Sequence, residues 1–282
     1  MPGQQQQLSH WKDERTCLLD PEDGDNASCS GITSKSYWQE IIPWYPEGCS
    51  GPYRLKGGYS RRELLADGVV HALGVGAGLV AFGALLVNIC VEQLPVQVAL
   101  SLLVYGIALM AMFCLSAVFN GFAWTSYIRA LQLADHAGIL FLISGTYTPT
   151  MTMACCPRML AFVWSLVLVS FVAKATRSRF DVIGLHVVCF LLTGWCVVFV
   201  WRGMTIAFSP WACSMALIGG AFYTIGLIPW ALNRIEFHNA IWHIFVLAGS
   251  ACFFAIQYYE VSQPAHWHQT SRGTCQGVLF AR

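Results

Sequence analysis

The chain has 282 residues, of which 56% are hydrophobic and 11% are charged, and its formal net charge is +1. Soluble domains carry about 25% charged residues, so this composition excludes a protein whose whole surface faces water. The near-zero net charge gives no electrostatic reason to expect a nucleic-acid partner.

The first 58 residues differ in composition from the rest of the chain. They are polar, contain the glutamine run Gln4–Gln7, and lack the apolar core of a secretory signal. We expect residues 1–58 to form a cytoplasmic arm that is partly disordered.

Seven apolar segments follow, and charged residues mark their ends rather than interrupting them. About 20 apolar residues span the hydrocarbon core as a helix, and a chain in lipid satisfies its backbone hydrogen bonds internally. The pattern predicts an all-α polytopic membrane protein, a seven-transmembrane-helix bundle at residues 59–260 with a short tail at residues 261–282. The expected helices are Ala66–Val91, Val96–Phe119, Ala137–Cys156, Met159–Ala175, Val182–Trp201, Pro210–Ala231 and Asn239–Tyr259.

The distribution of lysine and arginine between the loops predicts the orientation. Cytoplasmic loops are enriched in these residues. With the N-terminus inside, the inner loops hold nine of them and the outer loops before the tail hold only Arg158 and Arg202. We therefore expect an integral membrane protein with a cytoplasmic N-terminus and an outer or lumenal C-terminus. The nine inner residues are Arg54, Lys56, Arg61, Arg62, Arg129, Lys174, Arg177, Arg179 and Arg234.

The twelve cysteines predict no disulfide framework. Half of them lie inside the apolar segments, where cysteine behaves as a small hydrophobe, and no CxxC metal spacing occurs. We expect the adjacent Cys155 and Cys156, just before Pro157, to be free thiols in a loop or facing lipid.

The strongly polar residues of the apolar segments are all expected at the same end of the bundle, near the inner leaflet. Ser116 and Asn120 lie four residues apart on the second segment, and Asn239 and His243 do so on the seventh. Residues with this spacing share a helix face, so the two pairs can face one another across the bundle.

Two further segments supply ionisable groups to this end. Glu63, Asp67 and His71 recur every four residues and form a polar stripe on the first helix, and Asp135 opens the third segment beside His136. Polar groups in hydrocarbon cost several kcal/mol unless they pair or line a cavity. The set predicts an internal polar site; the alternative is simple interhelical hydrogen bonding, worth about 0.6 kcal/mol per bond.

These residues, in this order, resemble the hemolysin III and progestin/adipoQ receptor family of seven-helix membrane proteins. The resemblance extends from about Glu63 to Tyr259. The strings that carry it are Glu63–Gly74, Ser116–Asn120, Asp135–Pro149, Gly219–Gly226 and His238–Ser250.

The resemblance implies a zinc ion near the inner leaflet, held by Ser-x3-His on the second helix and His-x3-His on the seventh, with a serine and an aspartate supporting a water molecule. Ser116, Asp135 and His243 match this pattern, whereas the other two ligand positions hold Asn120 and Asn239. A neutral amide is a poor zinc ligand, so the usual set is incomplete. A rearranged set of His71, Asp135 and His243 retains three ligands.

Three functions fit this pattern. The first is a receptor-like or lipid-binding membrane protein with a degenerate metal site, in which Asn120 and Asn239 pair and hold two helices together. The second, which the resemblance implies, is a zinc-dependent lipid amide hydrolase of the ceramidase type, with Asp135 as general base and Ser116 orienting the water.

The third is a pore-forming or cytolytic protein, suggested by the family name alone. It is disfavoured because the expected polar groups lie at one end and leave no polar path through the outer half. In all three cases the expected partners are membrane lipids and a lipid or peptide ligand, and nucleic acid is not expected.

Overall fold

The computed structural model describes residues 54–55, 59–121, 128–176, 183–232 and 235–263. The chain divides into two units, residues Met1–Glu47 and Gly48–Arg282, and every described residue belongs to the second. Most of the expected N-terminal arm therefore lies outside the described residues. The described part begins with a pair of two-residue antiparallel strands, β1 (Arg54–Leu55) and β2 (Tyr59–Ser60).

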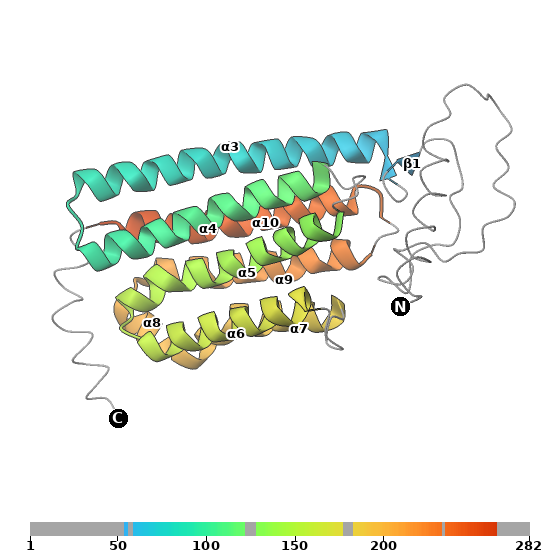
Figure 1. Ribbon diagram of the computed structural model, residues 1–282. Helices are drawn as coiled ribbons and strands as arrows, with labels where there is room; N and C mark the ends of the chain where they lie inside the picture. Colours follow the sequence, from blue (N-terminus) through green and yellow to red (C-terminus); the bar gives the residue numbers. More distant parts are fainter. Residues whose placement is uncertain (1–53, 56–58, 122–127, 177–182, 233–234, 264–282) are drawn as a thin grey trace, which may run out of the picture. The chain divides into compact units, whose positions relative to one another are not determined.

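Seven helical segments follow, which confirms the predicted all-α membrane bundle (Figure 1). Among the described residues, six stretches of helix are long and apolar enough to cross a membrane, one of them formed by α7 and α8 together, and α5 is the seventh segment. The helices are α3 (Arg61–Val91), α4 (Val96–Gly121), α5 (Ile128–Met153), α6 (Pro157–Ala175), α7 (Ile183–Trp195), α8 (Trp201–Ala207), α9 (Pro210–Ala231) and α10 (His238–Ile256).

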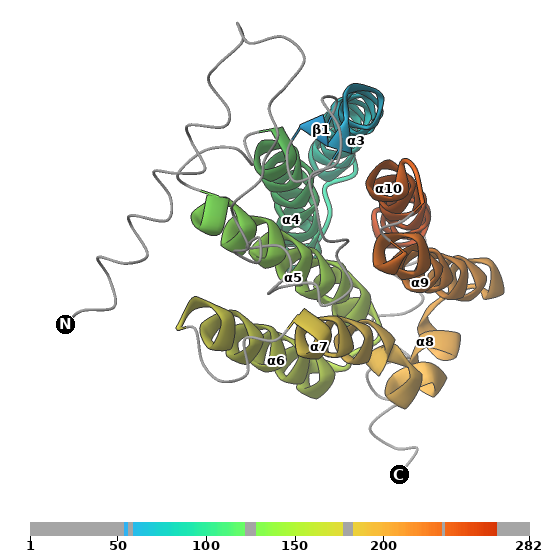
Figure 2. The ribbon, with the colours of Figure 1, turned by 90° about the vertical axis from the view of Figure 1, so that its right-hand side faces the viewer.

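The packing of the helices brings the first and the last together. α4 lies between α3 and α5, while α10 packs against both α9 and α3 (Figure 2). In the most apolar stretch of α4, 50% of the residues are buried, whereas in the corresponding stretch of α3 only 17% are buried. α4 is therefore an interior helix, and α3 turns most of its apolar surface outward, as a helix that contacts lipid does.

The predicted fifth segment is interrupted rather than continuous. A 3₁₀ turn, η1 (Cys196–Val200), separates α7 from α8. The hydroxyl of Tyr147 on α5 donates to the carbonyl of Gly194 at 2.9 Å and accepts from the amide of Val197 at 2.8 Å. A side chain that inserts into the backbone ladder breaks a helix at that point. The sequence did not indicate this break, because it depends on a residue of another helix.

α10 ends in a single π-helical turn, η2 (Gln257–Val261). The turn and the residue that follows it make polar contacts with three other helices. The amide of Gln257 donates to Thr150 of α5 at 3.1 Å, and the carboxylate of Glu260 accepts from the hydroxyl of Ser209, the N-cap of α9. Ser262, just after the turn, accepts from Asn88 of α3 at 2.9 Å.

This turn corrects the expectation that the buried polar residues lie at one end only. Gln257 is 0% and Glu260 6% exposed, and Gln257 lies about 21 Å along the helix from His243. The sequence places both at the boundary of the last apolar segment, where they are indistinguishable from exposed residues. Their partners belong to other helices, so their burial follows from tertiary packing.

The expectation that Cys155 is a free thiol is also wrong. Cys155 is disulfide-bonded, whereas Cys156 is a free thiol. The partner of Cys155 is not among the described residues. Cys155 is the second residue after α5 and has a left-handed backbone, with φ of 52°, so the turn between α5 and α6 is locally constrained.

Gly145 allows α5 to approach α4 closely. A β-carbon built at Gly145 would lie 2.5 Å from the β-carbon of Ala108, well inside contact distance, and small residues at membrane-helix interfaces permit such approaches. Gly83 on α3 is the opposite case, because a β-carbon there meets nothing within 4 Å.

We predict that Gly145→Ala lowers the thermal unfolding temperature of the detergent-solubilised protein, because overpacking of this kind costs about 1–3 kcal/mol. Gly83→Ala, the matched control, is expected to leave the temperature unchanged or raise it, since alanine favours helix by about 1 kcal/mol over glycine. Equal effects of the two substitutions would contradict the assigned α4–α5 contact. Unfolding monitored by size-exclusion chromatography after heating measures both.

Candidate metal-binding site

The start of α3 is held by a capping box and is tied to the start of α10. Ser60 accepts from the amide of Glu63 at 3.2 Å, and the Glu63 carboxylate accepts from the amide of Ser60 at 2.7 Å. The other oxygen of Glu63 accepts from the amide of Phe237 at 3.3 Å. Phe237 has a left-handed backbone, φ 62°, and directly precedes α10. Glu63 thus places the first turns of α3 and α10 next to each other.

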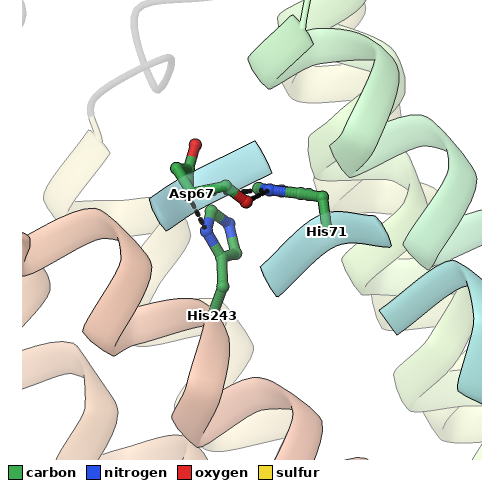
Figure 3. A group of neighbouring side chains, drawn as sticks. All are labelled: Asp67, His71 and His243. Atoms are coloured by element: carbon green, nitrogen blue, oxygen red, sulfur yellow. Dashed lines mark hydrogen bonds and ion pairs between the residues drawn. The ribbon is translucent and has the colours of Figure 1, made fainter. Parts of the chain in front are cut away.

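Asp67 and His71 of α3 meet His243 of α10 one or two turns further in. Figure 3 shows the two imidazole rings converging on the carboxylate. Asp67 Oδ1 lies 2.9 Å from His243 Nδ1 and 3.5 Å from His71 Nδ1. The ring centroids of the two histidines are 4.1 Å apart. We call these three residues the α3–α10 cluster.

The cluster is nearly sealed from solvent. The side chains of Asp67 and His71 are each 9% exposed, and that of His243 is 12% exposed. Ionisable groups at such depth are costly unless they pair with one another or hold an ion. A carboxylate and two imidazoles whose donor atoms lie within 4.8 Å of one another can do either.

A second layer of polar groups comes from α4 and the first turn of α10. Ser116 Oγ and Asn120 Nδ2 each lie 3.3 Å from Nε2 of His71. Asn239 Nδ2 donates to Asn120 Oδ1 at 3.2 Å. These two amides therefore link α4 to α10, which is the pairing predicted from the sequence for a receptor-like protein.

The structure therefore brings together five of the six residues named from the sequence: His71, Ser116, Asn120, Asn239 and His243. Asp135 is half-buried on α5, two turns inside the helix rather than at its start, and it is not a member of the cluster. A role for Asp135 stays a prediction.

The carboxylate that joins the two histidines is Asp67. The sequence placed Asp67 in the polar stripe of the first helix but did not assign it to the site. The available signal was its spacing of four residues from His71, which puts both on one face of the helix. That signal identifies a pair on α3, but the contact with His243 depends on how α10 packs.

The donor atoms of the cluster fit a zinc ion. Zinc is held by imidazole nitrogen, thiolate or carboxylate, and catalytic sites with two histidines and one carboxylate are known. The ligand positions that the family resemblance implies on the second and seventh helices hold Asn120 and Asn239, whose neutral amides are poor zinc ligands. The cluster offers a ligand set of suitable chemistry next to those positions.

The fold and the cluster together define a polytopic helical membrane protein with a buried, ionisable site at one end of its bundle. The family model described as "Haemolysin-III related" matches residues 60–254. The chain therefore belongs to the haemolysin-III-related family, which confirms the predicted membership, and it is an integral membrane protein.

Bacterial and mammalian relatives support this assignment. The hemolysin-3 homolog of Bacillus subtilis (strain 168) is 28% identical over 214 residues, covering 73% of this chain and 98% of the relative. The hemolysin-3 of Bacillus cereus is 25% identical, covering 70% and 92%. The monocyte to macrophage differentiation factor of Homo sapiens is 26% identical, covering 57% and 71%. No solved structure shows a significant match.

We predict that the double substitution Asn120→His with Asn239→His raises the zinc affinity of the protein by orders of magnitude. The two positions face each other and lie beside His71 and His243, so the change supplies two imidazoles where amides now stand. Zinc competition with a chromophoric chelator measures the affinity. An unchanged affinity in a protein that still folds would show that positions 120 and 239 do not face the ion.

Proposed function

We propose that this protein is a receptor-like, metal-binding membrane protein, in which a divalent ion, zinc in the first instance, joins α3 to α10 near the cytoplasmic leaflet. The observation that carries the proposal is the convergence of Asp67, His71 and His243 from two helices at a buried position. Outside metal and catalytic sites, such a group has little reason to be kept in a membrane bundle.

The cluster would hold the ion, and its surroundings would control it. Bound zinc supplies a fixed double positive charge and Lewis acidity. Glu63 positions the two helix starts, and Asn120 orients His71 while linking α4 to α10 through Asn239. A site shared by helices far apart in sequence couples ion binding to their relative position, which is what a receptor-like role requires.

A lipid or peptide ligand is the proposed partner, together with the surrounding membrane lipids. The side of the cluster toward the bundle interior is apolar. A small cavity there is lined by His71, Ser116 and His243 and by the side chains of Val70, Met112, Phe113, Val246 and Leu247. An apolar ligand that approaches the cluster would meet this surface first.

The proposed orientation places the cluster on the cytoplasmic side. Lysine and arginine are concentrated in the loops at that end. The disulfide of Cys155 lies at the opposite end, beyond α5, and disulfides persist in oxidising compartments. Both observations support a cytoplasmic N-terminus and an outer or lumenal C-terminus.

Hydrolysis of a lipid amide is the second candidate function, favoured by Ser116. Its hydroxyl lies beside His71 and lines the same cavity as His243, where it could orient a water. Pore formation is not proposed. Buried polar groups lie at both ends of the bundle, but Gln257 and Glu260 of η2 each hydrogen-bond to a residue of a neighbouring helix, Thr150 and Ser209 respectively.

We predict that the purified, detergent-solubilised protein contains close to one zinc per chain, and that His243→Ala loses it, because a site left with a single imidazole is weak. Elemental analysis after removal of loosely bound metal measures the content. Ser262→Ala, at the opposite end of α10, is the matched control and is expected to retain the ion. Absence of zinc from the wild-type protein would refute the proposed function.

Turnover separates the two candidate functions. A receptor-like protein is expected to show no metal-dependent release of fatty acid from a panel of N-acyl lipids, including ceramides, in reconstituted vesicles. Turnover that disappears on Ser116→Ala and on chelation would favour the hydrolase, and loss on Asp135→Asn would assign the general base to Asp135. Mass spectrometry of the released acid measures the rate.

A further inference from the structure

The contacts of His71 determine which of its nitrogens carries the proton. Nδ1 lies 2.7 Å from the main-chain oxygen of Asp67. A carbonyl oxygen only accepts, so Nδ1 donates, and in the neutral ring Nε2 then bears the lone pair. The groups around Nε2 agree with this, because Asn120 Nδ2 and Ser116 Oγ can both donate to it.

The orientation of the Asn120 amide is itself settled by its neighbours. Its Nδ2 lies 3.0 Å from the main-chain oxygen of Ser116, which only accepts, and its Oδ1 accepts from Asn239. Nitrogen and oxygen therefore cannot be exchanged without losing both bonds. The group that Asn120 presents to His71 is an N–H donor, and Nε2 of His71 is the acceptor.

His243 has the same arrangement. Its Nδ1 lies 2.9 Å from Oδ1 of Asp67. An ionised carboxylate only accepts, so Nδ1 donates, and in the neutral ring Nε2 of His243 then bears the lone pair. Both imidazoles thus donate from Nδ1 to the same residue, one to its backbone and one to its side chain.

This is the arrangement that metal-ligating histidines adopt. Such a histidine usually donates its non-ligating N–H to a carboxylate or a backbone carbonyl, which fixes the ring and increases its basicity. Both rings and Ser116 line one cavity of about 20 Å³, enough for a single water-sized occupant. Ser116 Oγ is 3.3 Å from Nε2 of His71, about the separation of two ligands of one tetrahedral zinc ion.

We propose that Asp67 is a positioning residue rather than a metal ligand. The ion is held by Nε2 of His71 and Nε2 of His243 on the cavity side of the rings, with the Ser116 hydroxyl as the adjacent oxygen. Asp67 lies behind both rings and holds them. This assignment rests on the proposed metal-binding function and goes beyond it, because proximity alone would make Asp67 a third ligand.

The substitution Asp67→Asn distinguishes the two roles. An asparagine side-chain oxygen still accepts from Nδ1 of His243, and the main-chain oxygen that holds His71 is unaffected. As a ligand, however, a neutral amide is a poor replacement for a carboxylate. Asp67→Leu, which removes the acceptor altogether, and His243→Ala complete the series, and Ser262→Ala at the far end of α10 is the control.

Zinc affinity by chelator competition and the visible absorption spectrum of the Co²⁺-loaded protein are measured for each variant in detergent. We expect Asp67→Asn to stay within about tenfold of wild type with an unchanged Co²⁺ spectrum. Asp67→Leu is expected to lose about 10–100-fold, the usual effect of removing such a support, and His243→Ala to lose more. The Asp67→Asn result decides the assignment even where Asp67→Leu does not fold.

The outcomes separate the two proposals. If Asp67→Asn loses as much affinity as His243→Ala, with a changed Co²⁺ spectrum, Asp67 is a ligand and the inference is overturned while the proposed function stands. If wild type binds neither zinc nor Co²⁺ more tightly than His243→Ala does, the proposed metal-binding function itself is wrong.

Discussion

The contact between Asp67 on the first helix of the bundle and His243 on the last governs the arrangement of everything around it. A carboxylate in a membrane-spanning bundle has no water to solvate it, so its lone pairs must be satisfied by neighbouring helices. Here they are met by an imidazole that lies 2.9 Å away and comes from a residue far along the sequence. The relative position of α3 and α10 is set by that requirement.

Other polar contacts at this end support the same geometry. Glu63 links the two helix starts through the amide of Phe237, while Asn120 and Asn239 link α10 to α4. At the opposite end, the turn η2 contacts α5 and α9 through Gln257 and Glu260, and Ser262 just after it contacts α3. Between these ends the packing is mostly apolar, with close approaches at glycines such as Gly145. Polar pairing at the two ends therefore fixes the register of helices whose apolar surfaces alone would tolerate sliding.

Asn120 and Asn239, which stand where the family resemblance implies metal ligands, have a consistent physical role in this arrangement. Asn120 uses both of its N–H groups and its oxygen, on Ser116, His71 and Asn239. A histidine at position 120 could not make the same three bonds. At position 120 the side chain links α4 to α10, and the ionisable groups that contact His243 are Asp67 and His71 of α3. The ionisable centre thus lies on α3 and α10, whereas the pattern that the family resemblance implies draws on the second and seventh helices.

The sequence by itself determined the class of the protein. The apolar segments, the sparse charges at their ends and the two i,i+4 pairs predicted a seven-helix membrane protein with a polar site at one end, because helix length and helix periodicity are local properties. Tertiary structure alone decided which carboxylate meets His243, that Gln257 and Glu260 are buried, and that Tyr147 breaks the helix after Trp195. Each of these depends on a partner from a distant helix, and packing between helices is not encoded in the periodicity of any one segment.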